Sequence, residues 1–249
     1  MLTDLDFYLL GIPAVLLYGI AKGGFGGAIA ILAVPLMSLM MAPSQAAAIL
    51  LPILVLMDFV VVYSFRGHCD RRALKLLLPG ALVGIGLGWL FADVLSEALT
   101  RLLVGSIAIA FGTQFLLGSE AKKGREHRRG PAVVFGMIAG FTSFSIHAGG
   151  PPFTMYMLPK RLPPMVFAGT AGVFFMVVNL VKLPPYYALG LFTAENLSLS
   201  AVLMPFAPLG VLLGRFLVRR SPAEVYYRLI AAFLVVVGLK LLHDGLTAL

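Results

Sequence analysis

Long apolar runs separated by short polar connections make up most of this chain. Runs of roughly membrane length lie at 7–41, 44–65, 73–92, 98–118, 131–159, 163–182, 196–218 and 223–243. They predict eight membrane-embedded helical segments. Two of them, 7–41 and 131–159, differ from the others because glycine and proline interrupt their apolar pattern.

The interruptions are AKGGFGGAIAILAVPL at 21–36 and SIHAGGPPFTMYMLP at 145–159. Broken helices expose backbone polar groups that lipid cannot satisfy, so such backbone lies where protein buries it or where it lines a polar cavity. One break in each half is typical of secondary transporters built from repeats, whose site lies between paired broken helices. The pattern therefore indicates a transport site.

The two halves align at an offset of about 121 to 126 residues, with Pro79 opposite Pro205 and Gly84 opposite Gly210. We expect a single transmembrane transporter domain over 1–249, with repeat 1 at about 7–118 and repeat 2 at about 131–243. A basic linker at 119–130 joins them, and we expect it to be cytoplasmic.

Loop charge sets the expected topology, because Lys and Arg favour the cytoplasmic side. Basic residues follow the second run (Arg66 to Lys75), fill the linker and recur at Lys160 and Arg161. Segment 131–159 must then enter and leave by one face, and segment 7–41 would do the same from the other. As one helix, 7–41 would be roughly 50 Å long, too long for a core of about 30 Å.

The predicted fold is therefore an all-α polytopic membrane protein with two inverted structural repeats. Each repeat contains a glycine-broken, re-entrant helical hairpin plus three transmembrane helices, and both termini lie outside. Composition supports the membrane class. Hydrophobic types make up 60% of the 249 residues, and the mean hydropathy is +0.97. Charged residues make up 12%, about half the fraction usual in soluble proteins.

Other classes fit less well. The net charge of +8 comes from residues at segment ends rather than from a continuous basic face, so nucleic acid is not an expected partner. Cys69 is the only cysteine and the histidines are scattered, which argues against a disulfide, a metal site or another cofactor. GGFGG lacks the spacing of a phosphate loop, and no Ser, His and acid arrangement indicates an enzyme. Because Asp4 and Asp6 precede the first apolar run without a basic residue, we expect no cleaved signal peptide.

Lys22 is the sharpest candidate for substrate binding, because a lysine inside an apolar segment is costly unless it pairs, faces water or meets an anion. Snorkelling to an interface is the alternative. Glycine lets backbone N–H groups approach an anion at a helix end. The expected contributors are Gly23, Gly24, Gly26 and Gly27 in the first break and Gly149 and Gly150 in the second.

Further candidates lie near the second break or at equivalent places in the two halves. His147 is a candidate anion donor or proton carrier, or a histidine fixed by a structural hydrogen bond. Asp58 would pair with Lys22 or carry the coupling proton, and Asn179 is its uncharged counterpart, for which helix packing is the alternative. Candidate hydroxyls are those of Thr142, Ser143, Ser145 and Thr170, for each of which helix packing is the alternative. Tyr186 and Tyr187 are expected at an interface.

The glycine cluster followed by an apolar run and Pro-Leu, the proline-containing turns APSQAAAIL and LPPMVFAGTAGVFF, and the basic loops between halves resemble the TauE/SafE family of sulfite exporters. The resemblance covers nearly the whole chain, although Lys22 beside the glycines and AAAILL depart from the commonest pattern. It implies a multi-pass protein of the bacterial inner membrane that moves small anions such as sulfite or sulfoacetate by ion-coupled transport.

We therefore expect a proton-coupled anion transporter that works by alternating access, with the small anion, protons and membrane lipids as partners. A passive anion channel and a non-transporting membrane assembly factor remain alternatives. Saturable countertransport would separate a transporter from a channel. A Lys22 variant with normal flux would favour the assembly role.

Overall fold

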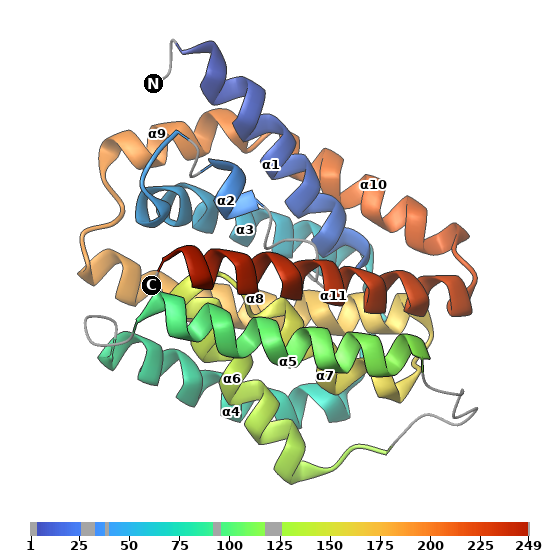
Figure 1. Ribbon diagram of the computed structural model, residues 1–249. Helices are drawn as coiled ribbons and strands as arrows, with labels where there is room; N and C mark the ends of the chain where they lie inside the picture. Colours follow the sequence, from blue (N-terminus) through green and yellow to red (C-terminus); the bar gives the residue numbers. More distant parts are fainter. Residues whose placement is uncertain (1–3, 26–32, 38–39, 92–95, 118–125, 249) are drawn as a thin grey trace.

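The computed structural model describes residues 4–25, 33–37, 40–91, 96–117 and 126–248. All the regular secondary structure within these ranges is helical (Figure 1). The helices of the first half are α1 (Leu5–Gly24), α2 (Ala33–Met37), α3 (Pro43–Ser64), α4 (Arg71–Leu90) and α5 (Glu97–Leu117). Those of the second half are α6 (Arg129–Ile146), α7 (Gly150–Met157), the 3₁₀ turn η2 (Leu158–Lys160), α8 (Pro164–Ala188), α9 (Ala194–Leu203), α10 (Phe206–Arg220) and α11 (Ala223–Thr247).

Seven helices within the described ranges are long and apolar enough to cross a membrane, and the α9–α10 pair would make eight. The prediction of an all-helical, polytopic membrane protein is therefore confirmed. The sequence-based bounds differ at two places. The segment predicted at 163–182 continues as α8 to Ala188, and the segment predicted at 196–218 is bent by 45° between α9 and α10. Pro205 lies at the bend and has no N–H to continue the α9 ladder.

Two long helix pairs pack in parallel through glycines. Along α1 and α10, a Cβ added at Gly23 would lie 2.2 Å from the carbonyl oxygen of Val211. Along α4 and α6, a Cβ at Gly84 would lie 2.0 Å from the carbonyl oxygen of Met137. Such distances are shorter than any real Cβ contact, so only glycine permits these backbones to approach so closely.

Two further pairs are antiparallel. α3 packs against α8, where Gly172 lies beside Val61 and Gly169 beside Phe65. α5 packs against α11, where Gly112 lies beside Val235. Each half thus contributes one helix to every long pair, and the two halves are interlocked rather than placed side by side.

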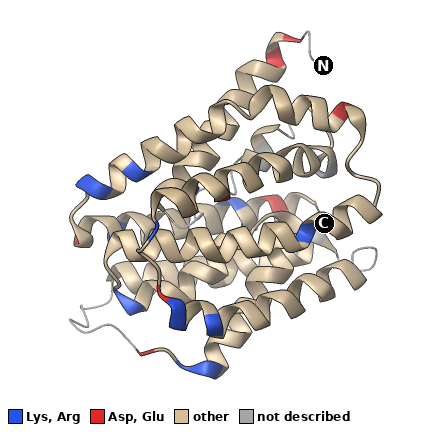
Figure 2. Cartoon of the chain, turned by 180° about the vertical axis from the view of Figure 1, so that it is seen from behind, with Lys and Arg blue, Asp and Glu red and all other residues tan. Residues whose placement is uncertain are grey.

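The ends of segment 129–160 lie together. Lys160 Nζ donates to the carbonyl oxygen of Glu126 at 2.5 Å, and the Tyr156 hydroxyl lies 3.1 Å from His127 Nδ1. The chain therefore passes along α6 and comes back along α7 and η2. Figure 2 shows most of the Lys and Arg residues on the side of the molecule away from the two chain termini.

Candidate functional site

The last turn of α1 carries a lysine into the interior. The Lys22 side chain is 5% exposed and forms an ion pair with Asp58 Oδ1 of α3, whose side chain is 1% exposed. Lys22 Nζ also donates to the carbonyl oxygen of Leu54 at 3.2 Å. Lys22 therefore does not snorkel, and burial with a carboxylate partner is the arrangement that makes such a cation tolerable.

The other carboxylate oxygen of Asp58 is held from the second half of the chain. Asn179 Nδ2 of α8 donates to Asp58 Oδ2 at 2.6 Å, and Asn179 is 3% exposed. The antiparallel packing of α3 and α8 brings these residues together across the interface between the halves. The network Lys22–Asp58–Asn179 consequently joins three helices at one buried carboxylate.

The break after α6 turns on a histidine. His147 has φ 52°, in the left-handed region, and the N–H of Ala148 donates to the carbonyl oxygen of Thr142 at 3.0 Å. The Thr142 hydroxyl lies 2.8 Å from the carbonyl oxygen of Ile138 and 3.0 Å from that of Ala148, and its one hydrogen can be donated to either. A non-glycine residue in this conformation is uncommon. Here backbone and side-chain bonds hold the turn, so the hydroxyl of Thr142 acts within the break.

His147 is fixed by an aromatic side chain of α8. Its Nε2 and the hydroxyl of Tyr186 are hydrogen-bonded at 2.8 Å, and both residues are buried. The prediction that Tyr186 marks an interface is wrong, since Tyr186 is 4% exposed, whereas Tyr187 is 77% exposed. Adjacent residues of a helix point in different directions, so one tyrosine of the pair is buried and the other is exposed.

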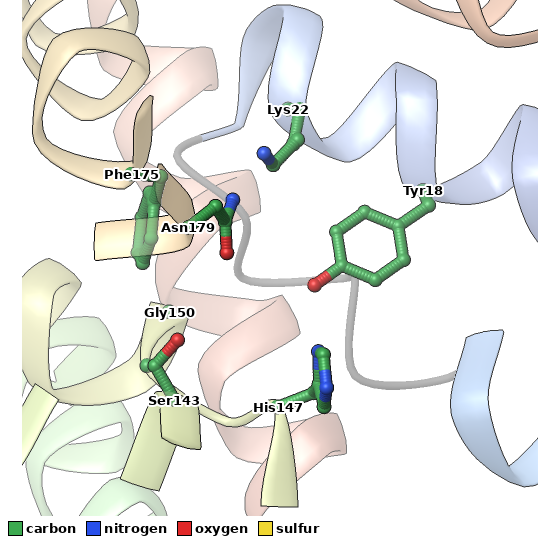
Figure 3. Close-up of a pocket in the computed structure, with 8 residues that line it drawn as sticks. Tyr18, Lys22, Ser143, His147, Gly150, Phe175 and Asn179 are labelled. Atoms are coloured by element: carbon green, nitrogen blue, oxygen red, sulfur yellow. The ribbon is translucent and has the colours of Figure 1, made fainter. Parts of the chain in front are cut away.

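Between these two regions lies a small cavity of about 10 Å³, which is about the room that one ordered water needs. It is lined by Tyr18, Lys22, Ser143, His147, Gly149, Gly150, Phe175 and Asn179. Figure 3 shows Tyr18 and Lys22 projecting from α1 toward Asn179 and His147, with Ser143 on the opposite wall. A cation, hydroxyls, an amide and an imidazole thus converge on one small space.

Several predicted site residues lie in this cavity: Lys22, Ser143, His147, Gly149, Gly150 and Asn179. Gly23 and Gly24 instead face α10, where added Cβ atoms would meet Val211 and Val218. Their absent side chains therefore serve helix packing. Gly26 and Gly27 lie outside the described residues.

Two predicted hydroxyls lie elsewhere. Thr170 of α8 accepts from the backbone N–H of Asp70 at 2.9 Å and donates to the carbonyl oxygen of Val166, so it anchors the connection before α4. Ser145 is half-buried on α6 and is not part of the cavity lining. Residues two positions apart on a helix do not share a face, which separates Ser145 from the lining residue Ser143.

Sequence reasoning missed Tyr18, Phe175 and Lys182. Lys182 of α8 is fully buried, and its Nζ donates to the carbonyl oxygen of Ser143 at 2.7 Å. It occupies the apparent end of an apolar run, where a lysine usually lies at an interface. Tyr18 and Phe175 carried no signal, since aromatic residues in apolar runs are common.

The described residues contain no group of three or more His, Cys, Asp and Glu side chains placed to hold a metal ion. The cavity lining is rich in hydrogen-bond donors. Ammonium, hydroxyl and amide groups are donors of the kind that bind oxyanions. The missing side chain of Gly149 serves packing, since an added Cβ would lie 2.8 Å from the carbonyl oxygen of Ala139.

Comparison with known families gives one clear result. Residues 11–241 match the family described as Sulfite exporter TauE/SafE. No curated protein and no solved structure matched the chain.

Proposed function

The chain belongs to the TauE/SafE family of sulfite exporters, which are membrane transporters and not enzymes, and on that premise we propose that it is a secondary transporter of a small sulfur-containing or organic anion. Sulfite and sulfoacetate represent the substrate class. Transport is proton-coupled and proceeds by alternating access. Its membrane is the bacterial inner membrane.

One observation carries this proposal: a buried lysine and four other polar side chains line a cavity between the end of α1 and the break after α6. Charged groups within apolar segments are expensive and are kept where they serve a substrate or ion path. An assembly factor with glycine-packed helices would not need such a cluster. The anion binds in this cavity against Lys22, Ser143, His147 and Asn179.

The two halves act as inverted repeats, repeat 1 over about 7–118 and repeat 2 over about 131–243. The helix pairs support this, because α1 with α10 and α6 with α4 are equivalent parallel pairs, while α3 with α8 and α5 with α11 are antiparallel pairs. Exchanging the halves leaves this pattern unchanged. A two-fold axis that crosses both antiparallel pairs would relate the halves.

Each repeat contains a hairpin that enters and leaves by one face. The contacts of Lys160 with Glu126 and of Tyr156 with His127 support a hairpin in the second repeat. Alternating access then consists of one repeat rocking against the other around the cavity. The contact between Asp58 and Asn179 crosses the moving boundary, so it breaks or reforms during each cycle.

Asp58 or His147 carries the coupled proton. Protonation of Asp58 would neutralise the partner of Lys22 and free the ammonium for the anion, which links proton binding to anion binding. His147 is the second candidate, because it borders the cavity and contacts Tyr186 on α8.

Flux into proteoliposomes tests the proposal. Labelled sulfite should enter in a saturable manner, an imposed pH gradient should drive it, and unlabelled sulfite on the opposite side should accelerate exchange. Sulfoacetate and acetate serve as competitors. Non-saturable flux without countertransport would indicate a channel, and no flux of any of these anions by correctly folded protein would contradict the transport assignment.

A further inference from the structure

Lys182 lies behind one wall of the cavity and has no assigned role. It is fully buried on α8, three positions after the cavity-lining residue Asn179. Its Nζ donates to the carbonyl oxygen of Ser143 at 2.7 Å and lies 3.5 Å from the Ser143 hydroxyl. The Tyr186 ring centroid is 5.5 Å away. These neighbours carry no formal charge.

The charges buried in the described part of the chain do not balance. The buried Lys, Arg, Asp and Glu side chains there are Lys22, Lys182 and Asp58. When both lysines are protonated, two positive charges and one negative charge leave a net charge of +1. Asp58 is already paired with Lys22 and accepts from Asn179, so the excess positive charge is that of Lys182.

A net charge inside a low-dielectric region is costly, and an ion of opposite sign removes much of that cost. One singly charged anion in the adjoining cavity brings the sum to zero. A doubly charged anion of similar size brings it to −1 and creates a new buried charge. The balance of charge therefore distinguishes the two ligand classes.

The geometry allows Lys182 to reach the cavity. Its present partner, Ser143, is itself a cavity-lining residue, so the ammonium lies within hydrogen-bond distance of the cavity lining. A lysine has a flexible four-carbon stem and three donors. It can turn from the Ser143 carbonyl to an anion while the Ser143 hydroxyl donates to the same anion.

We propose that Lys182 supplies the positive charge that the substrate neutralises, and that the site therefore selects singly charged oxyanions over doubly charged ones. This inference rests on the proposed transport function and specifies its substrate class. Hydrogensulfite, sulfonates and carboxylates with one negative charge belong to the selected class. Sulfate and other dianions do not, and sulfoacetate, which carries a sulfonate and a carboxylate, is among them, so the inference narrows the proposed class to its singly charged members.

Methanesulfonate and sulfate form a suitable probe pair, because both are tetrahedral and differ chiefly by one negative charge. Each would be tested as an inhibitor of labelled sulfite flux into proteoliposomes. Methanesulfonate should inhibit at concentrations at least about tenfold lower than sulfate, a ratio that corresponds to one decade in affinity. Inhibition by sulfate at equal or lower concentrations, or no inhibition by methanesulfonate, would overturn the inference.

Charge variants give a second readout that does not need transport, namely the rise in melting temperature that each anion produces. Lys182→Gln should lose at least about nine-tenths of its affinity for methanesulfonate, whereas the matched variant Lys240→Gln on α11 should keep it. Asp58→Asn raises the buried charge and should shift the preference toward sulfate. Unchanged preferences in folded Lys182→Gln and Asp58→Asn would contradict the role of Lys182.

Failure of charge selection and failure of anion transport would give different results. Sulfite flux that sulfate and methanesulfonate inhibit equally would leave anion transport intact and remove only the charge selection. Absence of sulfite flux, together with absence of stabilisation by either anion, would remove the proposed function itself.

Discussion

At the scale of single residues, the centre of this protein is organised by one buried carboxylate. Asp58 accepts from Lys22 of α1 and from Asn179 of α8. The sequence pointed to Lys22 and Asp58, because a charge inside an apolar run stands out. It did not point to Lys182, because that lysine follows a run of ordinary membrane length and only the continuation of α8 to Ala188 buries it.

Removing one partner of the ion pair between Lys22 and Asp58 should lower the free energy of unfolding far more than removing both. Lys22→Met leaves Asp58 buried without its cation, and the expected loss of stability is about 3–5 kcal/mol. The double variant Lys22→Met/Asp58→Asn should recover most of that loss. Unfolding in detergent measures both, and equal losses in the single and double variants would contradict this expectation.

At the scale of helices, the cavity is held by close helix packing. Gly84 of α4 faces the carbonyl oxygen of Met137, whereas Gly86, two positions later, has no atom within 4 Å of an added Cβ. The sequence aligns Gly84 with Gly210 of the second half, and both lie close to the backbone of a partner helix. It could not say which glycines touch a partner, because that depends on the rotation of each helix.

Gly84→Ala and Gly86→Ala form a matched pair in one helix. Gly84→Ala should lower the free energy of unfolding by about 1–3 kcal/mol, because the α4 and α6 backbones must move apart. Gly86→Ala should be neutral or should raise stability by about 0.5–1 kcal/mol, since alanine favours helix. Thermal melting of both variants checks the packing, and equal effects would mean that α4 and α6 do not meet at Gly84.

Asp70, in the connection before α4, makes a pH-dependent contribution to the stability of the fold. Burial alone raises the pKa of the Asp70 carboxyl, but hydrogen bonds from the Ala73 N–H, His127 and the Arg72 N–H outweigh it and lower the pKa. His127 Nε2 lies 2.7 Å from Asp70 Oδ2. A carboxyl with a lowered folded-state pKa stabilises the fold above its unfolded pKa of about 3.9, and this contribution disappears as the pH falls through the folded value.

Asp70→Ala should therefore cost about 0.5–2 kcal/mol at neutral pH, because it removes the N-cap of α4. The difference from the wild-type protein should shrink as the pH falls below the ordinary carboxyl range. Melting curves recorded as a function of pH provide the comparison. A difference that stays constant with pH would show that ionisation of Asp70 contributes nothing.

At the scale of the whole molecule, helix type, the all-α membrane class and the family were predictable, because they follow from apolar run length and from the repeated glycine breaks. The pairs of helices that contact one another were not predictable. Interlocking of the halves through α1 with α10 and α4 with α6 depends on glycines that meet across large sequence separations. The bend between α9 and α10 was also missed, since the aligned Pro79 lies inside an unbroken helix.

Loop charge and the proposed repeats predict where the chain ends lie. Both termini should be outside and the linker 119–130 inside. Alkaline phosphatase, which is active only outside the cytoplasm, should be active when fused to the C-terminus. A green fluorescent protein inserted in the linker should fluoresce. The reverse pattern would contradict the proposed orientation.

We infer that the buried network Lys22–Asp58–Asn179 belongs to the anion path. A comparison of two ion pairs tests this inference. Labelled sulfite flux would be measured for Lys22→Met/Asp58→Asn and for the control Lys240→Met/Asp244→Asn, which removes a Lys–Asp pair within α11. The account predicts that gradient-driven flux disappears in the first variant and persists in the second. Wild-type flux in a folded Lys22→Met/Asp58→Asn variant would contradict it.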